Sequence, residues 1–223
     1  MSEAAGAVGG AASPLPEAIP IFPLPGVLLL PRGRLPLNIF EPRYLAMTRD
    51  ALGGERLIGM IQPSDPGMRE TNPPLYPTGC AGRITSFSEA DDGRFLITLT
   101  GVSRFRIRRE LPLLSGYRRV VADWDPFAGD REPSDPTVEV DRERLLRALK
   151  AYFAQRQLSA DWDAVQAASA EHLVTSIAML CPFEPGEKQA LLDAPDFAAR
   201  ASLLTAILEM AASAAAPSSG TRH

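Results

Sequence analysis

The fold is decided by one stretch near the middle of the chain. Residues 75–107 read LYPTGCAGRITSFSEADDGRFLITLTGVSRFRI. Two segments rich in β-branched and aromatic residues, 79–88 and 95–108, flank the sequence Ala90-Asp91-Asp92-Gly93. Asp-Gly accepts the positive φ angles that a tight turn requires. The stretch therefore predicts a β-hairpin, with Gly101 marking a bulge in the second strand.

Similar short segments lie on both sides of this hairpin. Proline, glycine, asparagine and aspartate divide the chain from residue 19 to about 125 into short apolar pieces, which is typical of strands. Predicted strands cover 27–30, 35–40, 56–62, 79–88, 95–108 and 117–124. One helix interrupts them and is predicted to begin at Pro42, a residue suited to a first helical turn. Its expected inner face carries Tyr44, Leu45, Thr48 and Leu52.

The hydrophobic period changes from 2 to 3.6 after a proline-rich segment. Three prolines in residues 125–136 exclude a long helix and predict an exposed linker. Asp141 is predicted to cap a helix through residues 145–153, and Asp161 or Asp163 a second helix through 165–180, ended by Pro182. Two further helices are expected around 187–192 and 195–212.

Strands that precede helices, rather than alternate with them, predict an α+β fold. The expected parts are a flexible tail at 1–18, a β-rich subdomain at 19–125, a linker at 126–137, an α-helical subdomain at 138–213 and a second flexible tail at 214–223.

Bulk properties favour a cytoplasmic protein. The net charge of -4 argues against binding nucleic acid by bulk electrostatics. Two cysteines, Cys80 and Cys181, are too few for a fold that depends on disulfides. The first residues lack the basic and strongly apolar regions of a signal peptide. Apolar runs such as residues 27–30 are far shorter than the ~20 residues that span a bilayer.

The sequence also lacks the usual catalytic patterns. The two lysines, Lys150 and Lys188, do not follow a glycine as a phosphate-binding loop requires. His172 is not accompanied by a G-x-S-x-G nucleophile motif. The spacing of Cys80, Cys181 and His172 does not match a metal site. We therefore expect no catalytic residue, no metal and no cofactor.

Two sets of residues are candidates for binding. The aromatic residues Phe40, Tyr44 and Tyr76 are candidates for contact with other polypeptides. Arg104, Arg106 and Arg108 alternate with apolar residues, which predicts a solvated strand face and an alternative function in RNA binding.

Four stretches together resemble the amino-terminal domain of Lon proteases. They are IPIFPLPGVLLLPRGRLPLNIFEPRYLAM at 19–47, RLIGMIQ at 56–62, the stretch 75–107 quoted above, and EKQALLDAPDFAARASLLTAILE at 187–209. The resemblance implies a PUA-like β pseudo-barrel with a helical subdomain. In the family, this domain precedes an ATPase motor and a Ser-Lys protease.

The function implied by the resemblance is non-enzymatic. The domain would recognise unfolded or damaged polypeptide, and an extension of this role is an adaptor that serves a separate protease or chaperone. The expected partners are therefore unfolded or damaged proteins and a separate protease or chaperone; no membrane is expected, and nucleic acid is a partner only under the RNA-binding alternative. The sequence does not indicate an oligomeric state.

Overall fold

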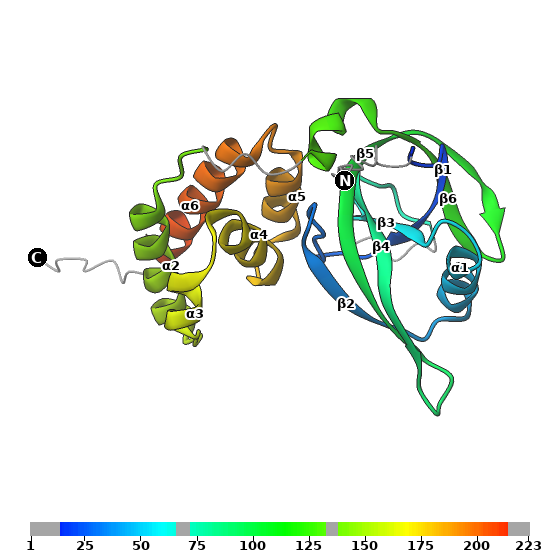
Figure 1. Cartoon of the computed structure of the whole chain (residues 1–223), viewed down its shortest axis with the longest axis horizontal. Coiled ribbons are helices and arrows are strands. Elements are labelled where there is room, and N and C mark those ends of the chain that lie inside the picture. Colours follow the sequence, from blue (N-terminus) through cyan, green and yellow to red (C-terminus); the bar gives the residue numbers. More distant parts are fainter. Residues whose placement is uncertain (1–13, 66–71, 133–137, 214–223) are drawn as a thin grey trace, which may run out of the picture.

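The structure is a computed structural model that describes residues 14–65, 72–132 and 138–213. Its architecture is α+β, with strands in the first part of the chain and helices in the second, as the sequence predicts. The two parts lie side by side (Figure 1). The strands are β1 Ala18–Pro23, β2 Arg34–Ile39, β3 Leu57–Ile61, β4 Thr78–Glu89, β5 Phe95–Leu114 and β6 Tyr117–Asp123.

Five of the six strands, β1, β3, β4, β5 and β6, close into a barrel, and β2 is added beside the first half of β5. Their order is β2-β5-β4-β3-β1-β6, and β6 pairs back onto β5. β1 and β3 are parallel, and the other pairs are antiparallel. Closure is possible because β5 has 20 residues, so that its first half pairs with β2 and its second half with β6. This leaves few unpaired strand edges.

The central hairpin is confirmed. Ala90 and Arg94 close the turn with a 2.8 Å backbone hydrogen bond, and Gly93 has a φ of 79°. The bulge at Gly101 is also confirmed, because Ala81 pairs with Ser103 while Gly82 pairs with Gly101. A Cβ atom on Gly101 would lie 2.0 Å from the Leu30 carbonyl oxygen, so the close approach of residue 30 to β5 requires glycine.

Two predictions in the first thirty residues are wrong. Residues 27–30 form no strand; Leu28, Leu29 and Leu30 are instead a buried irregular segment. Apolarity alone does not separate a buried loop from a buried strand. The first strand is β1, which the sequence pattern does not predict because it contains Pro20 and Pro23 and proline is unfavourable within a strand. Pro16, which lies in the predicted tail, already contacts the barrel, because Trp124 Nε1 donates to its carbonyl oxygen at 3.0 Å.

The helices agree with the sequence except in two places. α1 spans Pro42–Leu52, α2 Arg142–Arg156, α3 Trp162–Ala167, α4 Ala170–Leu180, α5 Pro185–Asp193 and α6 Phe197–Ser213. Asp141 and Asp161 are N-caps as predicted. The single helix expected at 165–180 is two helices, because Ser169 caps α4. In α1 the buried face is Tyr44, Met47, Thr48 and Ala51 rather than the face through Leu52.

The predicted linker is partly folded. A 3-10 helix, η1, spans Asp125–Arg131, and its Asp130 side chain is only 10% exposed. Short helices of this type tolerate the proline at the second position. Residues 133–137 of the predicted linker, and residues 1–13 and 214–223 of the predicted tails, lie outside the described residues.

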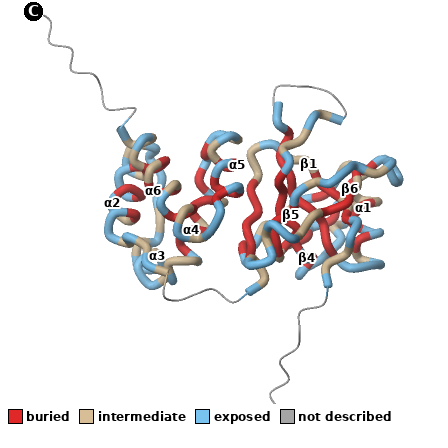
Figure 2. The backbone as a smooth tube through the Cα atoms, turned by 90° about the horizontal axis from the view of Figure 1, so that it is seen from above, coloured by how far each residue is buried: buried red, intermediate tan, exposed pale blue. Residues whose placement is uncertain are grey.

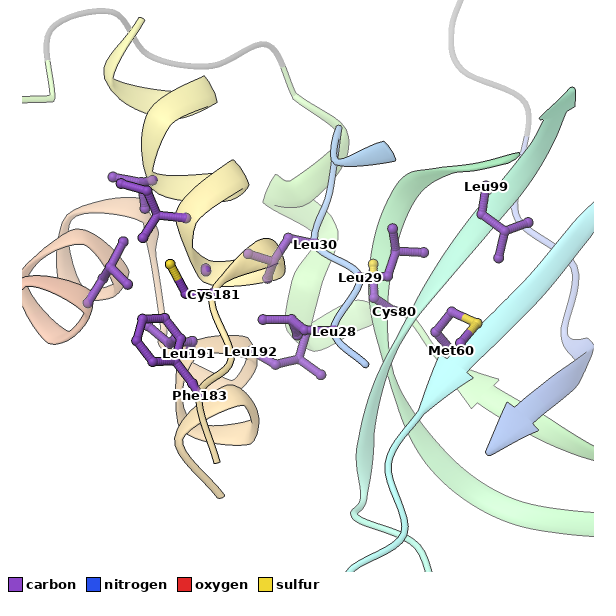
Figure 3. Close-up of a cluster of buried hydrophobic side chains, with 14 of the residues drawn as sticks. Leu28, Leu29, Leu30, Met60, Cys80, Leu99, Cys181, Phe183, Leu191 and Leu192 are labelled. Atoms are coloured by element: carbon purple, nitrogen blue, oxygen red, sulfur yellow. The ribbon is translucent and has the colours of Figure 1, made fainter. Parts of the chain in front are cut away.

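One continuous core joins the barrel and the helices. It extends from Met60, Cys80 and Leu99 in the barrel to Phe183, Leu191 and Leu192 in the helical part. Leu28, Leu29 and Leu30 lie between the two parts (Figure 3). Buried residues fill the barrel and the inner sides of the helices (Figure 2). The two subdomains are therefore held together by shared apolar packing.

Polar contacts beside this core fix the same junction. The Gln62 side chain, only 2% exposed, donates to Gln189 Oε1 and to the Pro185 carbonyl oxygen, both at 3.2 Å. Lys188 Nζ donates to the Gly26 carbonyl oxygen at 2.8 Å. Each contact connects α5 to the barrel or to the loop after β1, and buried polar groups require such partners.

An interdomain groove as candidate binding site

A cavity of about 560 Å³ lies where the barrel and the helical subdomain meet. This volume falls within the usual range of ligand sites. We call this cavity the interdomain groove. It is lined by Pro31, Arg32, Arg104, Pro126, Phe127, Gly129, Asp130, Glu132, Val138, Ser169, Ala170, Glu171, Thr175, Pro195, Asp196, Phe197 and Arg200.

The groove wall combines apolar residues from both subdomains with seven charged residues. Pro31 belongs to the loop before β2, and Pro126 and Phe127 belong to η1. Pro195 and Phe197 come from the junction of α5 and α6. Phe127 and Phe197 are both partly exposed. Two partly exposed aromatic rings facing one cavity are typical of binding sites for apolar ligands.

Arg104 and Asp130 form the base of the groove. The Arg104 guanidinium makes a double hydrogen bond to the Asp130 carboxylate, through Nε and Nη2 at 2.8 Å each, and the backbone N–H of Arg104 adds a third bond at 2.9 Å. Arg104 Nη1 donates to the carbonyl oxygens of Leu192 and Ala194, at 3.0 and 2.6 Å. The Arg104 guanidinium also stacks on the Phe127 ring at 4.5 Å. One buried side chain therefore connects β5, η1 and the turn after α5.

Arg32 lines the groove and connects α4 to η1 and the residue after it. Its backbone adopts a left-handed conformation with φ 64°. Its guanidinium pairs with Glu171 of α4 and donates to the carbonyl oxygens of Asp130 and Glu132, at 2.9 and 3.3 Å. Arg32 also lines a smaller adjacent cavity of about 250 Å³ that reaches Met179 and Leu180. The two cavities share the lining residues Arg32, Ser169, Glu171 and Thr175.

Two helices begin at the groove. Ser169 accepts a hydrogen bond from the His172 N–H at 3.2 Å and so caps α4, and Asp196 accepts one from the Ala199 N–H at 2.8 Å in α6. Both capping residues line the groove. The amino ends of helices carry partial positive charge, so both helices favour negative charge in the groove.

Arg200 is buried in the groove without full pairing. Its residue is 7% exposed, and its Nε donates to the Leu191 carbonyl oxygen at 2.9 Å. Within the described part of the chain, no atom accepts a hydrogen bond from its buried Nη2. Burial, reinforced by the nearby positive charge of Arg104, lowers the pKa of Arg200 to about 10. Arg200 is still a cation at neutral pH.

The aromatic residues predicted to bind are not brought together in this groove. Phe40 is 63% exposed at the end of β2. Tyr44 is 6% exposed and packs on Phe22 with ring centroids 4.2 Å apart, so its ring belongs to the core. Tyr76 is partly buried, and its N–H donates to the Gln62 carbonyl oxygen at 3.0 Å. The expectation that Tyr44 offers a binding surface is wrong, because its ring is used in packing.

The predicted solvated arginine face is also wrong in part. Arg104 is 4% exposed and bonded as described above. Arg108 pairs with Asp123 at 3.1 Å and with Asp125 at 3.7 Å, while Arg106 is exposed. An RNA surface requires clustered free cations. Burial and pairing remove two of the three predicted arginines from such a cluster.

The two cysteines and His172 lie in environments that do not activate them. Burial raises the pKa of the Cys80 thiol and raises that of Cys181 to about 11, which makes both inert at neutral pH. His172 lies near Ser176 on the exposed side of α4. Among the residues that the structure describes, no three His, Cys, Asp or Glu side chains cluster as metal ligands would.

The sequence does not reveal the groove residues Arg32, Phe127, Phe197 and Arg200. They come from four separated segments and meet only through the fold. The resemblance of residues 187–209 to a family segment includes Phe197 and Arg200, but that pattern alone indicates only helix packing.

Residues 18–210 match the family model described as the ATP-dependent protease La (LON) substrate-binding domain. This match defines the chain as a substrate-binding domain. The chain belongs to this family.

Curated relatives are much longer than this chain. It is 27% identical over 208 residues to Lon protease 2 of Sorangium cellulosum, covering 88% of this chain and 25% of that protein. It is 26% identical over 204 residues to Lon protease 2 of Myxococcus xanthus, covering 87% and 24%. The chain thus spans about a quarter of the length of these relatives.

Solved structures agree with the fold. A Lon N-terminal domain protein from Xanthomonas campestris is 25% identical with a TM-score of 0.58, and the match covers 86% of this chain and 96% of that one. The N-terminal domain of Mycobacterium avium complex Lon protease is 14% identical with a TM-score of 0.57, covering 88% and 98%. The latter likeness shows the fold alone.

In the part of the chain that the structure describes, no helix is long and apolar enough to cross a membrane.

Proposed function

We propose that this domain binds exposed apolar segments of unfolded or damaged polypeptides in the interdomain groove. The observation that carries the proposal is the meeting of Phe127, Phe197 and three prolines, from both subdomains, around a cavity of about 560 Å³. Membership of the substrate-binding family supports the same function.

The shape of the site suits a chain segment that lacks its own fold. Arg32, Ser169, Glu171 and Thr175 line both the groove and the smaller cavity, where Leu180 is 79% exposed. An exposed leucine beside a groove extends the apolar surface along which a segment of several residues can lie. A native protein buries such segments and would not present them.

Fluorescence anisotropy with one labelled model protein tests this proposal. Reduced, carboxymethylated α-lactalbumin is permanently unfolded, and its native form is the control. We expect binding of the unfolded form only, with an affinity that changes little between low and high salt because apolar contacts are not screened. Binding of both forms alike, or of neither, would contradict the proposal.

Matched substitutions locate the surface. Leu180→Asp places a charge beside the smaller cavity, and Met210→Asp places one on α6, where Met210 is also largely exposed, at 61%. Both side chains are exposed, so neither change should unfold the chain. We expect Leu180→Asp to weaken binding several-fold and Met210→Asp to leave it unchanged. Equal effects would place the binding surface elsewhere.

An adaptor role is a further part of the proposal. The bound polypeptide would be transferred to a separate protease or chaperone, since the described residues form no catalytic site of the kinds considered above. Capture of such an enzyme together with a labelled client, lost in the Leu180→Asp variant, is the expected outcome. A client that binds without any enzyme joining it would limit the function to binding.

A further inference from the structure

Arg200 lies where three features of its surroundings disfavour a positive charge. It lies in the first turn of α6, close to the positive end of the helix dipole. It is buried, and it lies near a second buried arginine, Arg104. Each of these three features opposes a positive charge. Such local conflicts are expected mainly at functional sites.

The carboxylates near Arg200 do not offset its buried charge, because each already has another partner. Asp130 is already bonded to Arg104 through both of its oxygens. Asp196 is engaged as the cap of α6, and Glu171 pairs with Arg32. Arg200 Nη2 consequently remains a buried donor that no described atom satisfies, and such a donor calls for an acceptor from outside.

We propose that Arg200 is the anchor for a carboxylate of the polypeptide bound in the groove, an inference that rests on the proposed function. The carboxylate accepts from Arg200 Nη2 and is favoured by the amino ends of α4 and α6. The groove thus recognises an apolar segment that bears one negative charge. Glu132, Glu171 and Asp196 also line the groove, so a singly charged group suits it better than a phosphate dianion.

Small probes test the site independently of polypeptide binding. N-acetylphenylalanine and its amide differ only in the carboxylate. In ¹⁵N NMR of the whole chain, the Arg200 Nε–Hε resonance, assigned through its backbone, should shift with the acid. The amide should bind at least tenfold more weakly, a ratio that corresponds to about 1.4 kcal/mol. Equal responses to acid and amide, no response to either, or an equal response to inorganic phosphate would overturn the proposal.

Peptides then identify the source of the carboxylate. One apolar heptapeptide is prepared with a free carboxyl terminus, with an amidated terminus, and with an amidated terminus and one internal glutamate. Tighter binding of the first or the third form over the second supports the proposal and names the source. If the acid probe shifts Arg200 but unfolded α-lactalbumin does not bind, the proposed function fails while the carboxylate site stands.

Substitution gives a second measurement. Arg200→Gln can still donate to the Leu191 carbonyl oxygen but has no charge, and Arg200→Lys keeps the charge without the planar fork. We expect Arg200→Gln to lose the preference for the acid and to bind the acid and amide forms equally. A preference for the acid that survives in Arg200→Gln would overturn the assignment.

Discussion

Replacement of Arg104 with alanine tests the physical basis of the groove. The substitution leaves the Asp130 carboxylate, whose side chain is 10% exposed, without its cationic partner. It also frees the carbonyl oxygens of Leu192 and Ala194. Removal of one partner from a buried ion pair costs about 3–5 kcal/mol. This loss is a large part of the roughly 5–15 kcal/mol that stabilises a typical domain.

Urea denaturation followed by tryptophan fluorescence measures this loss. The chain has two tryptophans, and each reports on one subdomain. Trp124 packs on Phe105 of the barrel, and Trp162 packs on Phe153 of the helical part, with ring centroids 5.8 Å apart in both pairs. Two variants that each keep one tryptophan and retain Arg104 should unfold at the same urea concentration, because one core joins the two parts.

In Arg104→Ala we expect the two transitions to separate, since the connection between β5, η1 and the α5–α6 turn is lost. A double substitution, Arg104→Met with Asp130→Leu, should recover at least half of the lost stability, because it removes the uncompensated charge. A loss below about 1 kcal/mol for Arg104→Ala, or a double variant as unstable as the single one, would refute the reasoning.

Three further predictions follow from buried side chains. Leu30→Ala, at a position with 0% exposure, should lower the free energy of unfolding by about 2–5 kcal/mol in the same urea assay. Tyr117 is buried and donates to Asp50, which raises its pKa to about 12. Its stabilising contribution is therefore complete below pH 10 and lost as the pH rises toward 12, and Tyr117→Phe should remove this dependence in alkaline denaturation. Cys80 and Cys181 should not react with Ellman's reagent until the chain unfolds, and fast reaction of either native thiol would contradict their burial.

Elements with local signals could be predicted from the sequence. The hairpin at Gly93, the caps Asp141 and Asp161, and the order of strands before helices all follow from patterns within a few residues. The errors occur where the signal is not local. The segment Leu28–Leu30 is as apolar as a strand, but it packs between two subdomains and makes no ladder.

The predicted binding residues likewise divide into those with a local sequence signal and those without one. Helical spacing already assigns Tyr44 to the inner face of α1, and this pattern is a better guide than its aromatic character. Alternation along β5 does not foresee that η1 and the turn after α5 cover Arg104. Arg32, Asp130 and Arg200 come together only after the barrel and helices have packed, so no spacing in the sequence brings them together.

The wrongly predicted segment explains why the groove lies at the junction. Leu28–Leu30 joins the two cores, and the next residues, Pro31 and Arg32, line the groove directly. Both walls are therefore attached to one packed interior, which resists deformation. A preformed groove loses little conformational entropy on binding, which suits the proposed binding of an unfolded segment through apolar contacts of modest area. The same rigidity keeps Arg200 buried near Arg104, so that the carboxylate of the proposed segment would meet a donor already in place.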